Sequence, residues 1–306
     1  MKIGFVGLGK MGGNMVLNLL QKKFEVVGYN RSPESVKKLV PHGIVPSTSL
    51  EEMVSKLGKG RKVVWLMVAA GDPVKEMLFH EKSGLINFLE KGDIVIDGGN
   101  SFYKNTKENS KRLSEKGVVM LDSGTSGGPS GALKGLCLMI GGERGAYEDL
   151  KELWTALSVE NGYGYMGGSG AGHFVKMVHN AIEYGFLEAI GEGFGLLDSY
   201  DEKLELDQIA RLWSNGSVIE SKLVKLSALA LGAKEEFKKL DPYIDDNRET
   251  RWAISDAIDR EVPMTAIAYS LFARYDSRGR DAFAKRLIAA LRKEFGGHDV
   301  RNVKEA

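Results

Sequence analysis

Four polar residues in the middle of the sequence recur at the spacing of one helix face. They stand at positions i, i+3, i+4 and i+7 and are Lys176, His179, Asn180 and Glu183. The opposite side of the same predicted helix is apolar, so this polar stripe is costly to bury unless its members are paired or face a cavity. Burial would lower the pKa of a lysine toward the range of a general base, and a carboxyl group in the same pocket could act as the acid. The stripe therefore favours acid–base chemistry over the alternative of a solvated helix face.

A second candidate site lies at the start of the sequence, where Gly7-Leu8-Gly9-Lys10-Met11-Gly12 has the spacing G-x-G-x-x-G. The glycines permit a tight turn and a close approach of the backbone to a pyrophosphate, and the following helix N-terminus offers free N–H groups. The segment stands between a predicted strand and a predicted helix, which is the context that such a site requires. We therefore expect a dinucleotide to contact Gly7, Leu8, Gly9, Met11 and Gly12, the alternative being a glycine-rich turn without a ligand.

The end of the second predicted strand selects between the two nicotinamide dinucleotides. An acidic residue there would hold the 2′-hydroxyl of NAD. This sequence has Asn30, Arg31 and Ser32 instead. Arg31 can pair with a 2′-phosphate, and Asn30 and Ser32 can donate hydrogen bonds to it. The segment favours NADP, with NAD as the alternative if Arg31 stacks on the adenine.

The charge balance argues against a polyanionic partner. The 306 residues include 42 Lys and Arg and 41 Asp and Glu, for a net charge of +1, so we expect no nucleic acid partner. No stretch approaches the ~20 apolar residues of a membrane span, and the N-terminus does not resemble a signal peptide. The sequence therefore predicts a soluble, cytoplasmic protein with no membrane partner.

Cysteine and histidine usage indicates neither a disulfide nor a metal site. The single cysteine, Cys137, lies in an apolar run and is expected to be buried. His173 and His179 are six residues apart, which does not fit the i, i+4 spacing of helical zinc sites, and we expect no metal.

The first half of the sequence alternates apolar runs of strand length with amphipathic stretches. Several runs are apolar throughout, as strands covered on both faces are. The pattern predicts an α/β, Rossmann-like domain with a parallel, doubly wound sheet. The predicted strands are Ile3–Gly7, Glu25–Asn30, Lys62–Val68, Asp93–Asp97, Val118–Ser123 and Leu136–Ile140, and the predicted helices cover about residues 10–21, 33–40, 49–57, 72–79, 103–116 and 145–157.

The second half predicts helices alone. A proline-free helical pattern runs from Gly170 to about Ser199. No strand pattern is present after about residue 166, and we expect a nucleotide-binding domain over residues 1–166 and an all-α C-terminal domain over residues 167–306. Further helical stretches are predicted at about 205–232, 248–260, 263–276 and 280–295.

Five segments, spread in order over nearly the whole chain, resemble the motifs of the decarboxylating 6-phosphogluconate dehydrogenases. They are Asp97–Ser101, Thr125–Gly128, Gly172–Tyr184, Val262–Arg274 and Arg292–His298. The length is similar to that of the shorter class of the family, which lacks the duplicated helical half of the longer enzymes.

The resemblance implies an oxidoreductase that converts 6-phospho-D-gluconate to D-ribulose 5-phosphate and carbon dioxide, in the pentose phosphate pathway and gluconate metabolism. Lys176 would be the base that takes the proton of the 3-hydroxyl as hydride leaves carbon 3 for the nicotinamide. The resulting β-keto acid loses carbon dioxide without a metal, because the new carbonyl accepts the electrons. Glu183 would then be the acid that protonates carbon 1 of the enediol.

The resemblance also implies the binding residues and the assembly. The substrate carboxylate and hydroxyls would be bound by Asn100, His179, Asn180 and the turn of Ser126, Gly127 and Gly128. The phosphate end or the sugar hydroxyls near it would be bound by Tyr184, Arg274, Arg292 and His298, and the cofactor would also contact Val68 and Asn100. In the family the C-terminal tail reaches a neighbouring subunit's site, so the helical domain would bind substrate and form a homo-oligomer, a dimer or a tetramer.

Residue type alone leaves simpler roles open for several of these positions. Asn100 and Ser126 could be turn residues, and Arg274 and Arg292 could be surface arginines. One segment also departs from the longer enzymes, which carry a phosphate-contacting lysine and threonine before a tryptophan. Before Trp252 this sequence has Asn247 and Glu249 at those positions. A carboxylate beside a phosphate is unfavourable, so either Arg248 or Arg251 compensates or the phosphate is bound differently.

Three other functions stay open from the sequence. The first is the same enzyme with a preference for NAD. The second is a β-hydroxyacid dehydrogenase of the 3-hydroxyisobutyrate or tartronate-semialdehyde type, which needs neither an acid at Glu183 nor a phosphate site. The third is a non-catalytic NADP-binding module, which would have lost the lysine that is present here as Lys176.

Overall fold

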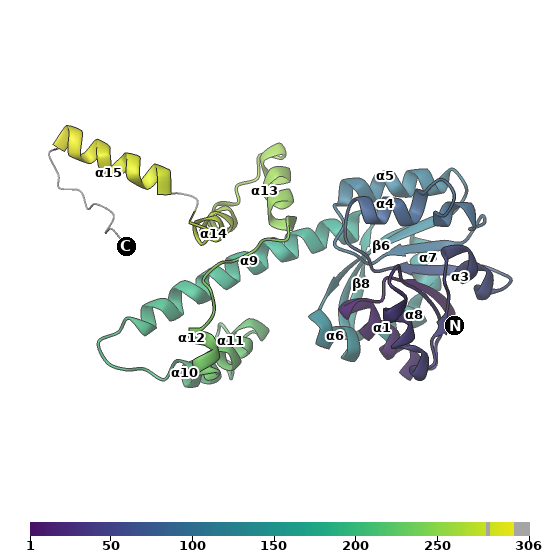
Figure 1. Ribbon diagram of the computed structural model, residues 1–306, viewed down its shortest axis with the longest axis horizontal. Coiled ribbons are helices and arrows are strands. Elements are labelled where there is room, and N and C mark those ends of the chain that lie inside the picture. Colours follow the sequence, from purple (N-terminus) through teal and green to yellow (C-terminus); the bar gives the residue numbers. More distant parts are fainter. Residues whose placement is uncertain (280–281, 297–306) are drawn as a thin grey trace. The chain divides into compact units, whose positions relative to one another are not determined.

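A computed structural model describes residues 1–279 and 282–296 of the chain. The chain divides into two compact units, residues 1–179 and the residues from Asn180 onward, and the division falls inside one long helix, α9 (Ala171–Asp198). The first unit contains strands and helices, and the second is helical (Figure 1).

An eight-stranded sheet forms the first unit. Its strand order is β3-β2-β1-β4-β5-β6-β7-β8, and all neighbours are parallel except β6 and β7. The chain builds outward from β1 in both directions, so the order reverses between β1 and β4, where dinucleotides bind in sheets of this kind. The strands are β1 (Lys2–Val6), β2 (Glu25–Tyr29), β3 (Val45–Pro46), β4 (Val63–Leu66), β5 (Ile94–Asp97), β6 (Val119–Ser126), β7 (Leu136–Gly142) and β8 (Ser158–Gly167).

Apolar clusters cover both faces of the sheet. The cluster on one face includes Met15 of α1 and Trp154 of α8, and the cluster on the other includes Met53 of α3 and Leu78 of α4. Because both faces are covered, a central strand such as β4 is buried at every position. The helices of this unit are α1 (Lys10–Gln21), α2 (Pro33–Lys37), α3 (Leu50–Leu57), α4 (Asp72–Phe79), α5 (Tyr103–Ser114), α6 (Gly128–Lys134), α7 (Arg144–Asp149) and α8 (Lys151–Leu157), with short 3₁₀ helices at Val40–His42 and Leu85–Asn87.

The predicted Rossmann-like fold is confirmed, and the six predicted strands are all present with small shifts at their ends. The sequence pattern misses β3, α6 and β8. β3 has two residues, too few for a periodic signal, and β8 is a glycine-containing edge strand that is mostly exposed or half-buried. An apolar alternation therefore does not mark it.

The expectation of a wholly parallel sheet is wrong at β7, which pairs antiparallel with β6. A parallel crossover requires about a dozen residues or more. Residues 127–135, which contain only the short helix α6, connect the two strands. The chain therefore returns in the opposite direction.

The expectation that Cys137 is buried is also wrong, because its side chain is exposed. Its neighbours Leu136 and Leu138 are buried in one of the two apolar clusters. Alternate side chains of a strand point to opposite faces, so Cys137 lies on the other face of β7.

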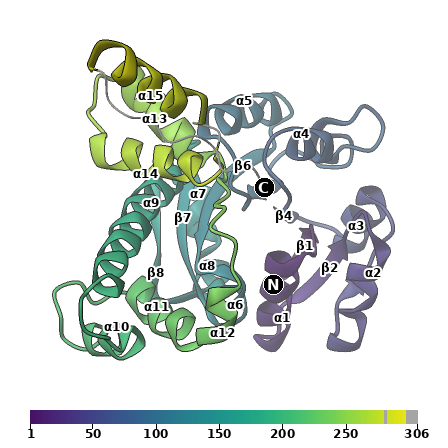
Figure 2. The same ribbon diagram turned by 60° about the vertical axis from the view of Figure 1, so that its left-hand side comes forward.

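Helices alone make up the described part of the second unit, as predicted. Two helices, α10 and α11, pack beside the second half of α9 (Figure 2), and α12 contacts α11. The ring of Phe194 on α9 meets that of Trp213 on α10 edge to face, with 5.5 Å between centroids. The helix predicted over 205–232 is two helices, because a turn with Gly216 in the left-handed region separates them. The bounds are α10 (Leu206–Trp213), α11 (Lys222–Gly232), α12 (Lys234–Lys238), α13 (Glu249–Asp259), α14 (Thr265–Asp276) and α15 (Ala282–Gly296).

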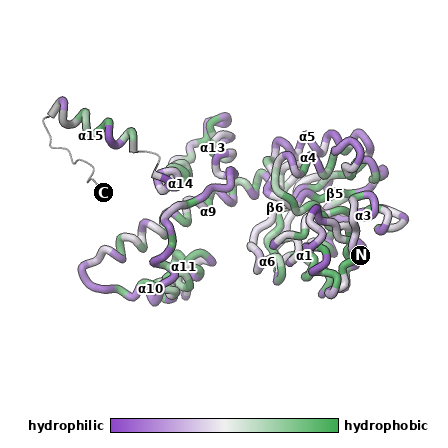
Figure 3. Tube along the Cα trace, in the orientation of Figure 1, coloured by the Kyte–Doolittle hydropathy of each residue, from purple (hydrophilic) through white to green (hydrophobic). Residues whose placement is uncertain are grey.

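Many large apolar side chains of the second unit are exposed. Figure 3 shows hydrophobic stretches along its helices, where Leu229, Ile258 and Phe272 are among the exposed residues. No helix within the described ranges is both long and apolar enough to cross a membrane.

The domain boundary between residues 166 and 167 stays a prediction.

Replacing Gly12 by alanine is expected to destabilise the first unit. A Cβ at Gly12 would overlap the carbonyl oxygen of Gly7, so we expect the free energy of unfolding to fall by about 1–3 kcal/mol. The neighbouring Gly13→Ala is the control, because a Cβ there would lie 3.5 Å from the Leu8 carbonyl oxygen, an ordinary contact. It should change stability by less than about 1 kcal/mol. Urea unfolding of both variants tests this, and equal effects would contradict it.

Candidate active site

The glycine-rich loop between β1 and α1 has the geometry that a pyrophosphate site requires. Gly7 has φ +92°, and a Cβ there would overlap the Met67 carbonyl oxygen. A Cβ at Gly9 would meet nothing within 4 Å, so the loop is open at that point. No side chain caps the N-terminus of α1, and its first turn has no acidic residue. Its N–H groups are therefore free to bind an anion.

Asn30 ties this loop to the segment that follows β2. Its Oδ1 accepts a hydrogen bond from the Leu8 N–H at 2.9 Å, and its Nδ2 donates to the Ser32 carbonyl oxygen at 3.0 Å. The next residue, Arg31, is exposed and makes no ion pair or hydrogen bond with the described part of the chain. Arg31, with an exposed side chain, thus directly follows the residue that is bonded to the dinucleotide loop.

The segment after β5 presents Asn100 at the surface. Asp97, fully buried, accepts hydrogen bonds from the Gly99 N–H at 3.0 Å and the Ser101 hydroxyl at 2.7 Å. These bonds fold the segment back on itself, and Asn100 is exposed at its tip. Val68 lies near it, because a Cβ at Gly99 would lie 2.7 Å from the Val68 carbonyl oxygen. A Cβ at Gly7 would likewise lie 3.0 Å from Val68 Cγ1, so Val68 lies close to both loops.

The first turns of α9 lie against β6 within the first unit. Lys176 is 5% exposed, and a Cβ at Gly124 of β6 would overlap its side chain. At the end of β6, the Ser126 hydroxyl lies 3.2 Å from His179 Nε2. Gly127 and Gly128 follow with φ +136° and +64° and begin α6. Within the first unit, the predicted serine–glycine–glycine turn therefore lies beside His179, and β6 lies against Lys176.

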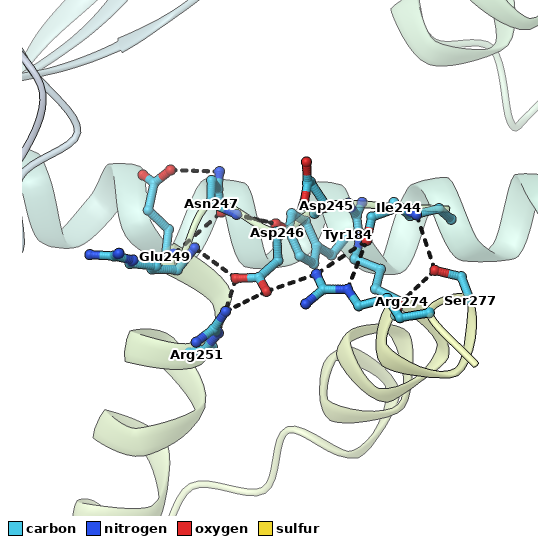
Figure 4. A network of polar contacts seen from close by, with 11 residues as sticks. Tyr184, Ile244, Asp245, Asp246, Asn247, Glu249, Arg251, Arg274 and Ser277 are labelled. Carbon is cyan, nitrogen blue, oxygen red and sulfur yellow. Dashed lines mark hydrogen bonds and ion pairs between the residues drawn. The ribbon is translucent and has the colours of Figure 1, made fainter. Parts of the chain in front are cut away.

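The second unit contains a network of amides around one buried carboxylate (Figure 4). Glu249, 2% exposed, accepts a hydrogen bond from Asn180 Nδ2 at 2.6 Å and another from Asn247 Nδ2 at 2.7 Å. The Tyr184 hydroxyl donates to Asn247 Oδ1 at 2.9 Å and accepts from the Asn247 N–H at 3.0 Å. The two residues that depart from the longer enzymes are therefore bonded to each other and to two residues of α9.

Besides Arg248, three arginines lie near this network, and two of them are paired with Asp246. Arg251 and Arg278 lie 2.6 and 3.1 Å from its carboxylate. Burial acts to raise the pKa of the Asp246 carboxyl, but hydrogen bonds from Arg251, the Arg248 N–H and Arg278 outweigh it and the pKa is lowered. The third arginine, Arg274, has its guanidinium carbon 3.5 Å from the centre of the Tyr184 ring and donates to the Asp245 carbonyl oxygen at 2.9 Å.

The remaining predicted residues fall on two helices and beyond them. Glu183 is half-buried on α9, Arg292 belongs to α15, and His298 lies outside the described residues. Sequence reasoning did not find Glu249 as a partner of Asn180, nor Asp122 and His173 as residues around the start of α9. In the sequence, each of these residues is only a charged or polar residue beside a motif. Many surface positions have the same property, so it does not identify a functional residue.

Two family models match most of the chain. One, described as the NAD binding domain of 6-phosphogluconate dehydrogenase, matches residues 2–167. The other, described as the C-terminal domain of 6-phosphogluconate dehydrogenase, matches residues 172–296.

Relatives in three organisms agree with these matches. A Haloferax volcanii protein named as an NAD(+)-dependent, decarboxylating 6-phosphogluconate dehydrogenase is 39% identical over 98% of both chains. The decarboxylating 6-phosphogluconate dehydrogenase of Haemophilus influenzae is 38% identical over 91% of this chain but only 60% of its own length. Among solved structures, the Plasmodium falciparum 6-phosphogluconate dehydrogenase, described with its cofactor NADP+ and its substrate 6-phosphogluconate, is 28% identical. Its TM-score is 0.84, covering 100% of this chain and 67% of that one.

Replacing Glu249 by alanine is expected to destabilise the second unit. The change removes the acceptor of two amide donors, one of them on the buried Asn180, and should lower the free energy of unfolding by about 1–3 kcal/mol. Glu235→Ala is the control, because Glu235 is exposed and forms a surface ion pair with Lys238 at 3.1 Å. Its loss should cost less than about 1 kcal/mol. Urea unfolding followed by tryptophan fluorescence compares the two, and a Glu249→Ala variant as stable as its control would refute the role of the network.

Proposed function

The chain belongs to the 6-phosphogluconate dehydrogenase family of NAD(P)-dependent, decarboxylating enzymes, and from that premise we propose that it converts 6-phospho-D-gluconate to D-ribulose 5-phosphate and carbon dioxide with reduction of NADP. The observation that carries the proposal is the polar stripe of α9. Lys176 is buried on it, and Glu183 follows seven residues later on the same helix face. An oxidation followed by a decarboxylation needs a base and then an acid, and these two residues supply both.

Lys176 is the proposed base. Its Nζ would take the proton of the substrate's 3-hydroxyl as general base. When bound, the nicotinamide accepts the hydride that leaves carbon 3. The β-keto acid then loses carbon dioxide, and the electron pair of the broken bond moves toward the new carbonyl, whose oxygen takes the proton back from Lys176. Glu183 donates a proton to carbon 1 of the resulting enediol while Lys176 takes the proton of the hydroxyl on carbon 2, which gives the ketose.

NADP is the proposed cofactor. The residues present fit a dinucleotide, since the N-terminus of α1 has no side-chain cap and the loop is open at Gly9. The exposed, unpaired Arg31 can form charge-assisted hydrogen bonds with a 2′-phosphate. NAD is the alternative, because the Haloferax volcanii relative is named as NAD(+)-dependent.

The phosphate end of the substrate is proposed to bind through Arg274 and Tyr184, with Arg292 and His298 as further contacts. Glu249 stands at a sequence position where the longer enzymes have a phosphate contact, but here its carboxylate is buried and accepts two amide hydrogen bonds. Arg251 is paired with Asp246. Both observations favour a phosphate that is bound differently from that of the longer enzymes, with Asn100, Asn180, His179 and Ser126 left for the carboxylate and hydroxyls.

The protein is proposed to act as a cytoplasmic homo-oligomer, a dimer or a tetramer, in the pentose phosphate pathway and gluconate metabolism. The support is the exposed apolar surface of the second unit, which includes Leu229, Ile258 and Phe272. Apolar surface of this extent usually marks a contact with another chain. The helical segment 167–306 is accordingly proposed as the substrate-binding and oligomerisation domain.

Replacing Lys176 by methionine tests the catalytic proposal. Wild-type protein supplied with 6-phosphogluconate and NADP is expected to reduce the cofactor, and Lys176→Met should lower kcat by about 100- to 10,000-fold, since it removes the general base. Cofactor binding should not change. Lys151→Met is the control, because Lys151 is an exposed residue of α8 paired with Glu148 at 2.6 Å. A Lys176→Met variant with full turnover would remove the proposed base.

Replacing Arg31 by alanine tests the cofactor preference. Loss of a charge-assisted contact to the 2′-phosphate should raise the Kd of NADP by about 10- to 100-fold, while the Kd of NAD stays the same. Arg61→Ala is the matched control, since Arg61 is a surface arginine paired with Asp149 at 2.7 Å. Fluorescence titration with both dinucleotides gives the constants. Equal weakening of NADP and NAD would show that Arg31 does not select the 2′-phosphate.

A further inference from the structure

The first turn of α9 lacks a capping side chain from its own neighbourhood in the sequence. The first N–H groups of any α-helix have no partner inside the helix and must be bound by something else. Gly170, directly before α9, has no side chain, and the buried hydroxyl of Ser169 has no hydrogen-bond partner within the described residues. The cap of this helix therefore comes from elsewhere in the chain.

Asp122 of β6 supplies that cap from across the fold. Its Oδ1 accepts a hydrogen bond from the Gly170 N–H at 2.8 Å, and its Oδ2 accepts one from the His173 N–H at 2.8 Å. The side chain is 1% exposed. A carboxylate at a helix N-terminus is also favoured by the positive end of the helix dipole. Both oxygens of one buried residue thus fix the backbone one turn before Lys176.

Glycines bring the helix backbone into direct contact with the sheet at this point. A Cβ at Gly172 would overlap the Met139 carbonyl oxygen, and a Cβ at Gly141 would lie 2.6 Å from the Gly172 N–H nitrogen and 2.8 Å from Asp122 Oδ1. Gly124 likewise leaves room for the side chain of Lys176. The helix cannot move closer to the sheet, and Asp122 keeps it from moving away.

The side chain of His173 fixes the rotation of the same turn. Its Nε2 lies 3.1 Å from the Asp97 carbonyl oxygen, so this nitrogen donates, and its Nδ1 lies 2.8 Å from the Thr106 hydroxyl. Asp97 ends β5 and shapes the segment that carries Asn100. The start of α9 is therefore tied to two strands and to α5 at once.

We propose that Asp122 is the positioning residue that sets the place of Lys176, by capping α9 from the sheet. The proposal rests on the proposed function, in which Lys176 is the base. A base must lie within hydrogen-bond reach of the proton that it takes, and a misplacement of about 1 Å can cost about 100-fold in rate. Asp122 itself touches no reacting atom in this account.

Replacing Asp122 by asparagine tests this proposal with little change in volume. The asparagine amide has one acceptor oxygen, whereas the N–H groups of Gly170 and His173 each need one. The substitution therefore breaks the cap. We expect kcat with 6-phosphogluconate to fall by about 10- to 100-fold, while the KM for 6-phosphogluconate and the Kd of NADP change by less than about threefold. A deuterium at carbon 3 should slow the variant more than the wild type, because a misplaced base makes the hydride step limiting.

Asp93→Asn is the matched control for a purely structural effect. Asp93 is 2% exposed and also accepts two backbone hydrogen bonds, from the Lys62 N–H at 2.7 Å and the Glu90 N–H at 2.8 Å. It precedes β5, at the opposite end of that strand from Asp97. Both variants should lose a similar amount of Tm, and only Asp122→Asn should lose kcat. Equal kcat in the two variants would overturn the proposal.

A second readout separates this proposal from the proposed function. Trinitrobenzenesulfonate labels lysine amines, and peptide mass spectrometry gives the labelling rate of Lys176 alone. Since loss of the cap opens the first turn of α9, Lys176 should label at least about fivefold faster in Asp122→Asn than in Asp93→Asn. A wild type without turnover would reject the proposed function, and the labelling rates would still decide on Asp122. Equal labelling would overturn the positioning role.

Discussion

The contact between the start of α9 and the β6–β7 pair is the constraint on which the rest of the molecule depends. A helix end cannot be buried against a sheet unless its free N–H groups find acceptors and its backbone finds room. Here Asp122 provides the acceptors and Gly124, Gly141 and Gly172 provide the room. Fixing the first turn of α9 also fixes the place of Lys176 and His179 in the first unit.

In the second unit, neighbouring amides compensate for a carboxylate at a position where the longer enzymes have a phosphate contact. A carboxylate at position 249 would repel a phosphate, yet Glu249 is buried and bonded to the amides of Asn180 and Asn247. A buried carboxylate without such donors would be costly. The tyrosine and arginine that remain, Tyr184 and Arg274, are stacked on each other at 3.5 Å. The network therefore connects the amide of α9 to the residues proposed for the phosphate end.

Local patterns in the sequence were enough to predict the fold class, the dinucleotide loop and the stripe of α9. The periodicity of apolar residues indicates which side chains are buried. The turn after β1 needs glycine for steric reasons, and the motif G-x-G-x-x-G identifies that turn in the sequence. The antiparallel β7, the edge strand β8 and the exposed Cys137 were not predictable in this way, because they depend on connection length and on which face is covered. Gly170 lies 48 residues from its partner Asp122, and Asn180 lies 69 residues from its partner Glu249. A single sequence contains no signal for such pairs.

We propose that the family's oxidative decarboxylation takes place on this chain, with Lys176 as the base and Glu183 as the acid. The most direct test is the ratio of carbon dioxide released to cofactor reduced when wild-type protein acts on 6-phosphogluconate with NADP. We expect one carbon dioxide for each reduced cofactor. Reduced cofactor without carbon dioxide would contradict this proposal. The chain would then only oxidise a hydroxyl, as a β-hydroxyacid dehydrogenase does, and no step would need a proton from Glu183.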